Sequence, residues 1–264
     1  MFGMFHSLWQ YRHFVLSSIR NELISRFARS KLGALWMIIN PLAQVAIYAL
    51  ILSNVLAAKL PGIDNKYAYA IYLMAGLLAW TLFNEITSRC LNLFIEHGNL
   101  MKKMSFPRIT LPIIVVGSSL INYVLLFIAM LAIFALLGHQ FSWAMLWLLP
   151  LSAILIVFAA GIGLILGIMN VFLRDVGQVI PIILQMWFWF TPIVYPENII
   201  PESFLPLMSL NPMYPIVSGY HQTLVYNQTP DLNGLIGITL FALALVLLSL
   251  FLFRRASEEM VDVL

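Results

Sequence analysis

Five long apolar runs, separated by short polar segments, dominate the sequence. An α-helix that crosses a bilayer needs about 20 apolar residues, and each of these runs is at least that long. One further run, residues 179–195, carries no charge, but its helix would span only about 25 Å of the ~30 Å hydrocarbon core. The pattern predicts six membrane spans, at residues 35–56, 67–94, 111–137, 143–172, 179–195 and 232–253.

The short run continues into residues 196–212, a stretch that stays apolar but is repeatedly broken by proline. Proline interrupts a helix, so no single long helix can pass through this stretch. Broken backbone at membrane depth persists only where protein or a water-filled cavity satisfies its amides and carbonyls. We therefore expect a re-entrant outer segment at residues 196–212. The aromatic residues 187–190 before it mark either the mouth of a conduit or an ordinary interface belt.

Residues 1–33 mix basic residues with apolar residues near helical spacing. The apolar positions are Phe14, Leu16, Ile19, Leu23 and Phe27. This pattern is typical of an amphipathic helix that lies in the membrane interface. A soluble lead-in helix is the alternative.

Composition and charge placement agree with a membrane protein. Hydrophobic residues make up 62% of the chain and charged residues 9%, whereas soluble domains carry about 25% charged residues. We expect an all-α polytopic membrane protein with residues 1–264 in one transmembrane domain. With a cytoplasmic N-terminus, every Lys and Arg except Lys59 and Lys66 falls on the inner side. The positive-inside rule therefore predicts that both termini are cytoplasmic.

The sequence offers little catalytic chemistry. It contains no phosphate-binding loop, no H-E-x-x-H motif and no clustered metal ligands, so neither an enzyme nor a bound metal is expected. Glu85 and Arg89 can pair at i and i+4 in the second predicted span, and we expect this pairing to be structural. Gly163 and Gly167 form a G-x-x-x-G pair that suits close helix packing. Because the spans hold few charges, energy for active transport would come from a separate subunit.

Residues 26–41, RFARSKLGALWMIINP, resemble the opening of the ABC-2 type polysaccharide-export permeases. Five further segments match this family in the same order, so the resemblance covers residues 26–212. They are GLLAWTLF at 76–83, NLMKKMSFP at 99–107, NVFLRD at 170–175, TPIVY at 191–195 and LNP at 210–212. The resemblance is strongest to the membrane subunit of O-antigen exporters, and the C-terminal residues 254–264 are similar to that branch.

The resemblance implies an ABC-2 type fold and a homodimer of this chain bound to two copies of an ATP-binding cassette ATPase. ATP and Mg²⁺ would bind to that ATPase, and this chain would hold no cofactor. The implied substrate is an undecaprenyl-diphosphate-linked polysaccharide, which crosses the bacterial inner membrane. Membrane lipid is a further partner, and nucleic acid is not. Capsule or teichoic-acid export, export of a drug or small lipid, and a passive channel are the alternatives.

Three groups of candidate functional residues follow. Aromatic rings suit a sliding neutral polymer, and the candidates near helix breaks and polar neighbours are Trp36, Tyr48, Trp80, Phe83, Trp187, Trp189, Tyr195 and Tyr214. The basic residues that could attract a lipid diphosphate, or merely set topology, are Arg12, Arg20, Arg26, Arg29 and Lys31. The resemblance implies that the first inner loop couples to the ATPase, and a second short turn is a minor candidate contact. The candidate residues are Asn99, Leu100, Met101, Lys102, Lys103, Phe106 and Pro107 in the loop, and Arg174 and Asp175 in the turn.

The first inner loop is expected to contain about one helical turn at residues 99–103, with Asn99 as its N-cap. Its apolar residues Leu100, Met101, Met104 and Phe106 would form a surface that fits a groove on the partner. Lys102 and Lys103 could instead be simple topology anchors.

Overall fold

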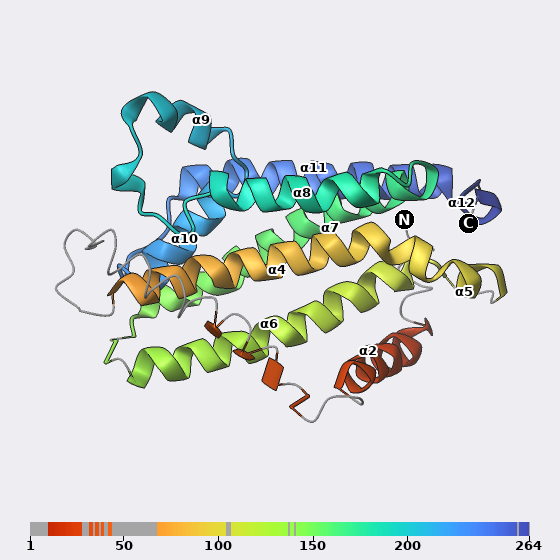
Figure 1. Ribbon diagram of the computed structural model, residues 1–264, viewed down its shortest axis with the longest axis horizontal. Helices are drawn as coiled ribbons and strands as arrows, with labels where there is room; N and C mark the ends of the chain where they lie inside the picture. Colours follow the sequence, from red (N-terminus) through yellow and green to blue (C-terminus); the bar gives the residue numbers. More distant parts are fainter. Residues whose placement is uncertain are drawn as a thin grey trace.

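The computed structural model describes residues 10–27, 32–33, 35–36, 38–39, 42–43, 68–103, 107–136, 138–139, 141–257 and 259–263. Within these residues every regular element is a helix (Figure 1). The elements are α2 (Arg12–Phe27), α4 (Ala68–Glu96), α5 (Gly98–Lys103), α6 (Thr110–Leu136), η1 (Trp143–Trp147), α7 (Leu148–Phe172), α8 (Val176–Phe190), η2 (Glu197–Ile199), η3 (Glu202–Phe204), α9 (Leu205–Ser209), α10 (Tyr214–Leu224), α11 (Leu232–Ala256) and α12 (Glu259–Val263).

Four helical stretches are long and apolar enough to cross a membrane: α4, α6, η1 with α7, and α11. They occupy four of the six predicted spans. Most of the predicted span at 35–56 lies outside the described residues. The predicted span at 179–195 corresponds to α8, which has 15 residues.

The predicted boundaries of the α8 span were wrong, because the helix begins at Val176 and ends at Phe190. Thr191 already has extended backbone, and it precedes Pro192, whose ring disfavours helical geometry at the residue before it. Residues 191–195 form a turn instead of completing the helix.

Helix α4 is the centre of the bundle. It packs against α6, α7 and α10, and α7 in turn packs against α11. Twenty of the 29 residues of α4 are buried, whereas α6, α8 and α11 keep broad apolar faces exposed. Exposed apolar faces of this size are expected where lipid or another membrane subunit covers them.

The two ends of the bundle differ. Helices α5 and α12 lie at one end, which we call the α5 end, and α9 and α10 lie at the other, the α10 end (Figure 1). Helix α2 lies beside α6 toward the α5 end. Arg108 donates to the backbone carbonyl and hydroxyl of Ser257, and α12 contacts α5 and α7. The C-terminal segment therefore packs against the bundle at the α5 end.

Gly163 and Gly167 allow the close crossing of α4 and α7, as the G-x-x-x-G spacing predicted. A Cβ atom at Gly163 would lie 2.8 Å from Cβ of Cys90 on α4. A Cβ atom at Gly167 would lie 2.3 Å from the carbonyl oxygen of Cys90. Helices in membranes associate largely through packing, so small residues at a crossing are valuable. Gly237 of α11, in contrast, has no atom within 4 Å of the equivalent position.

We expect Gly167→Ala to destabilise the bundle by about 1–3 kcal/mol, because the added methyl group forces α7 away from the α4 backbone. The chain has a single cysteine, Cys90, which is buried in this contact. The temperature at which Cys90 reacts with a thiol-specific dye therefore reports helix separation, and it should fall in this variant. Gly237→Ala is the matched control and should react like the parent chain. Equal transition temperatures for both variants would contradict the assigned contact.

Candidate functional site

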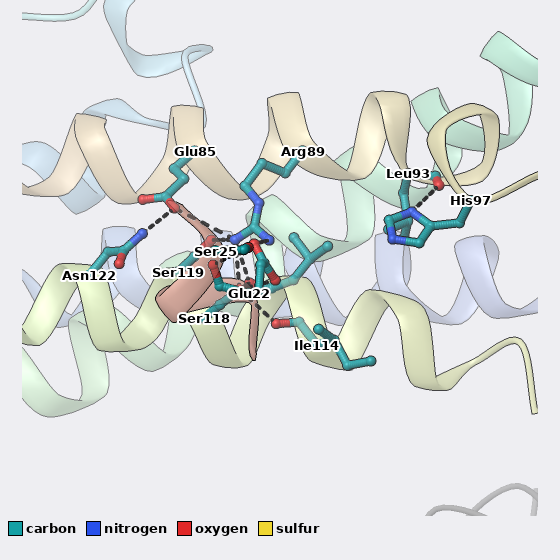
Figure 2. A network of polar contacts seen from close by, with 11 residues as sticks. Glu22, Ser25, Glu85, Arg89, Leu93, His97, Ile114, Ser118, Ser119 and Asn122 are labelled. Carbon is teal, nitrogen blue, oxygen red and sulfur yellow. Dashed lines mark hydrogen bonds and ion pairs between the residues drawn. The ribbon is translucent and has the colours of Figure 1, made fainter. Parts of the chain in front are cut away.

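A polar cluster links α2, α4 and α6 near the α5 end (Figure 2). Its centre is the guanidinium of Arg89 on α4. Nη1 of Arg89 donates to the hydroxyl oxygens of Ser118 and Ser119 on α6, at 2.8 and 2.9 Å. Nη2 donates to the carboxylate of Glu22 on α2, which also accepts a 3.1 Å hydrogen bond from Ser118. Three helices therefore share one half-buried charge network.

The predicted pair of Glu85 and Arg89 is confirmed, with 3.6 Å between Oε1 and Nη1. Glu85 also accepts a 2.6 Å hydrogen bond from Nδ2 of Asn122 on α6. The partner that sequence analysis missed is Glu22, which is 67 positions away from Arg89 in the chain. The signal in the sequence was that Glu22 is the one acidic residue in a segment, Arg12–Phe27, whose other charged residues are basic.

The apolar residues of α2 dock this helix on α6. Val15 and Ile19 are buried, and Ile19 lies over Gly117, where a Cβ atom would approach its Cδ1 to 2.5 Å. Arg12 and Arg20 are exposed. Arg26 lies in the last turn of α2, and Arg29 and Lys31 lie outside the described residues. The contact of α2 with α6 thus combines apolar residues with one acid, Glu22.

The predicted short helix in the first inner loop exists as α5, but two details differ. The helix begins at Gly98, so Asn99 lies within its first turn and is not the N-cap. Met101 is only 4% exposed and belongs to the hydrophobic core of this chain, so it cannot fill a groove on a partner in this conformation. Asn99 and Lys102 are exposed, and Leu100 is half-buried.

The other candidate coupling residues differ in position and exposure. Pro107 is half-buried, Lys103 ends α5, and Phe106 lies outside the described residues. Arg174 and Asp175 are exposed in the turn between α7 and α8 at the α5 end. This turn is held by Asn170, whose Oδ1 accepts from the Gly177 amide at 2.9 Å and whose Nδ2 donates to the Leu91 carbonyl at 2.9 Å.

Three of the conduit candidates meet inside the bundle. The Phe83 ring lies 5.3 Å from Trp80 and 5.2 Å from Trp187, measured between ring centroids. Phe158 of α7 stacks on Phe83 at 5.5 Å. Phe83 has no exposed surface and Trp80 is 8% exposed, so both rings pack in the core of the chain and touch no passing polymer in this conformation.

The remaining conduit candidates are more accessible. Trp189 is 52% exposed and Trp36 is 45% exposed. Tyr195 and Tyr214 are half-buried at the α10 end, and the Tyr195 hydroxyl donates to the Trp189 carbonyl at 2.9 Å. Tyr48 lies outside the described residues.

Asn211 ties the two ends of the proline-broken segment together. Its Oδ1 accepts from Nε1 of Trp187 at 2.8 Å and from the Met213 amide at 3.0 Å. Its Nδ2 donates to Oγ1 of Thr191 at 3.0 Å and to the Phe190 carbonyl at 3.2 Å. Each hydrogen-bonding atom of this amide therefore makes two contacts. Ile193 and Val194 are still buried in the bundle, so only the residues after them leave it before the chain returns at Asn211.

Helix α10 is the element that sequence analysis missed. Its buried residues Ile216, Val217, Tyr220 and Leu224 recur at helical spacing and pack against α4 and α7. His221 stacks on Tyr72 of α4 with ring centroids 3.6 Å apart, and its Nε2 lies 3.1 Å from the Tyr72 carbonyl oxygen. Burial lowers the pKa of His221 to about 3, so this imidazole is neutral at neutral pH.

The candidate functional features are the polar networks at the two ends of the bundle. Among the described residues, no group of three or more His, Cys, Asp and Glu side chains could hold a metal ion. The polar side chains mostly satisfy one another at the two ends of the bundle, and the aromatic cluster occupies its interior. We therefore assign candidate roles to the two ends.

We expect Glu22→Ala to loosen α2 by about 1–3 kcal/mol, because it leaves the half-buried Arg89 guanidinium without its carboxylate on α2. Hydrogen exchange in α2 should become faster, while exchange in α7 stays unchanged. Asn21→Ala alters an exposed neighbour on the same helix and serves as the control. Unchanged exchange in α2 of the Glu22 variant would show that the apolar contacts alone hold the helix.

Comparison with known proteins places the chain in a family. It is 28% identical over 264 residues to "O-antigen export system permease protein RfbA" of Myxococcus xanthus, with 99% of each chain covered. A Klebsiella pneumoniae protein of the same name is 28% identical over 232 residues, 87% of each chain. "Polysialic acid transport protein KpsM" of Escherichia coli is 24% identical over 240 residues, 90% of this chain and 92% of that one. The family described as "ABC-2 type transporter" matches residues 14–225, and the chain belongs to this family.

Proposed function

We propose that this chain is the permease subunit of an ATP-driven exporter that moves a lipid-linked polysaccharide of the O-antigen type across the bacterial inner membrane. The observation that carries the proposal is similarity over the full chain to a permease named for O-antigen export. The bundle of long apolar helices supports it. Similarity to a polysialic acid transport protein makes a capsular polysaccharide the second candidate cargo, at lower identity.

The proposed assembly is a homodimer with two copies of an ATPase, which would bind ATP and Mg²⁺. Helices α6, α8 and α11 carry exposed apolar faces, which a second copy and lipid would cover. The four long helices, α8 and the undescribed part of residues 35–56 would together make six spans. The distribution of Lys and Arg supports placing the α5 end and both termini in the cytoplasm.

The polymer would begin its passage at the α5 end and leave at the α10 end. The exposed Arg12 and Arg20 of α2 are suited to attract the undecaprenyl diphosphate at an anionic membrane surface. The segment at residues 196–212 would act as a re-entrant closure of the exit. Trp189, Tyr195 and Tyr214 lie next to this segment and are the aromatic residues best placed to contact the emerging chain.

Export in a cell tests the function directly. We expect this gene, expressed with the ATPase gene that accompanies it, to restore surface polysaccharide to a strain that lacks only its permease. An ATPase variant unable to hydrolyse ATP should give no surface polymer and should leave lipid-linked polymer inside the cell. Normal surface polymer in the permease-deficient strain without this chain, or none with it, would refute the proposal.

The exposed residues of α5 are the proposed ATPase contact. We expect the double variant Asn99→Glu, Lys102→Glu to reduce ATPase co-purification at least about tenfold, because two new negative charges disturb a docked helix. The helix core, including Met101, is left intact. Arg255→Glu places a similar charge change at the same end of the bundle and is the control. Normal ATPase binding and export by the double variant would place the contact elsewhere.

A further inference from the structure

The α10 end contains an open cleft formed by two adjoining pockets of about 480 and 710 Å³. Both pockets are lined by Glu197, Ser218 and Gln222, so they share a wall. Ligand sites in proteins commonly enclose about 300–1,000 Å³, and each pocket is of that size. The cleft lies between the proline-broken segment, which carries Glu197, and helix α10, which carries the other two residues.

The lining of the cleft is rich in aromatic rings and in groups that bind hydroxyls. The first pocket adds Tyr72, Tyr226 and Gln228 to the shared wall, and the second adds Tyr214, Asn211 and Asn233. No Lys or Arg is among the lining residues of either pocket, and the sequence has none between Arg174 and Arg254. An anionic ligand would therefore meet a carboxylate and no compensating cation.

Two polar groups of the cleft, on His221 and Glu197, differ in what they offer a hydroxyl ligand. Nε2 of His221 lies 3.1 Å from the Tyr72 carbonyl, which fixes Nε2 as the donor and leaves Nδ1 as an acceptor. Nδ1 has no hydrogen-bond partner among the described residues, but it is buried, so a ligand in the cleft does not reach it in this conformation. The carboxylate of Glu197 lies near Tyr214, and burial together with this carboxylate raises the pKa of Tyr214 to about 12. The phenol is therefore protonated at neutral pH.

We propose that this cleft binds an uncharged segment of the exported polysaccharide and disfavours polyanionic chains such as those of sialic acid. Glu197 accepts hydrogen bonds from sugar hydroxyls, Gln222 and Gln228 exchange hydrogen bonds with them, and the half-buried rings of Tyr214 and Tyr226 pack on the C–H faces. The inference rests on the proposed function and narrows its cargo to neutral glycans. In this proposal, the α10 end binds the polymer while the polymer leaves the exporter.

A divalent cation is the main competing ligand, because Asp231 also lines the second pocket. Both Asp231 oxygens already accept backbone hydrogen bonds at the start of α11, from Asn233 at 3.2 Å and Gly234 at 3.1 Å. Calcium takes six to eight oxygen ligands, and Glu197 is the other carboxylate of the cleft. The described residues therefore favour a polyol over a metal ion.

The test uses the full chain in lipid nanodiscs and saturation-transfer NMR. The probes are neutral hexasaccharides of glucose, mannose, galactose and rhamnose, a sialic acid hexamer, and Ca²⁺ by calorimetry. We expect at least one neutral probe to bind and the sialic acid hexamer to bind at least about tenfold more weakly. Absence of neutral binding, equal or tighter binding of the sialic acid hexamer, or Ca²⁺ binding that displaces the sugar would overturn the proposal.

Variants assign the binding to the cleft. Glu197→Gln and Tyr226→Ala should each weaken neutral binding at least about tenfold, and Glu197→Lys should in addition improve sialic acid binding. Glu259→Lys makes the same charge change on α12 at the opposite end and should behave like the parent chain. Thermal unfolding checks that every variant is folded. Folded Glu197 and Tyr226 variants that bind like the parent chain would place the sugar elsewhere.

Export assays separate the two levels of the proposal. A parent chain that exports polymer but binds no neutral sugar would refute the cleft and leave the permease function intact. A parent chain that fails to export in the complementation experiment would refute the permease function itself.

Discussion

The close crossing of α4 and α7 is the contact on which the rest of the structure depends. Gly163 and Gly167 bring the α7 backbone against Thr87 and Cys90 of α4, closer than any side chain would allow. Helix α4 then supplies Arg89 to the network at one end and Tyr72 to the contact with α10 at the other. Because α11 packs on α7 and α6 on α4, each outer helix is positioned through this one crossing.

Polar side chains are concentrated where they can be satisfied without water. In the bilayer interior an unpaired polar group costs several kcal/mol, which explains why Arg89 is surrounded by two carboxylates and two hydroxyls. The half-buried Trp187 likewise donates a hydrogen bond from Nε1 to the side-chain carbonyl of Asn211. Between these two networks the interior is aliphatic and aromatic, so the bundle has a polar end on each side of an apolar centre.

The sequence predicted what depends on length and local spacing, and missed what depends on distant partners. Long apolar runs located α4, α6, α7 and α11 because a bilayer makes hydrophobic length the dominant signal. Residue spacing found the Glu85–Arg89 pair. The role of Glu22, the burial of Met101 and Phe83, and the packing of α10 all depend on residues far away in the chain. Near α10, frequent prolines resembled an irregular loop, although Pro215 in the first turn is compatible with a helix.

The fixed point at Asn211 ends the outer module, residues 197–210, which begins after the buried residues Ile193 and Val194. A loop whose ends meet at one amide can change in length at small entropic cost, since closure entropy grows only logarithmically with loop size. One wall of the outer cleft, at Glu197, belongs to this module, and the facing wall belongs to the rigid helix α10. Insertions or deletions in the module would therefore widen or narrow the cleft without moving the bundle. Under the proposed function, the length of this module would set the girth of the glycan that the cleft admits.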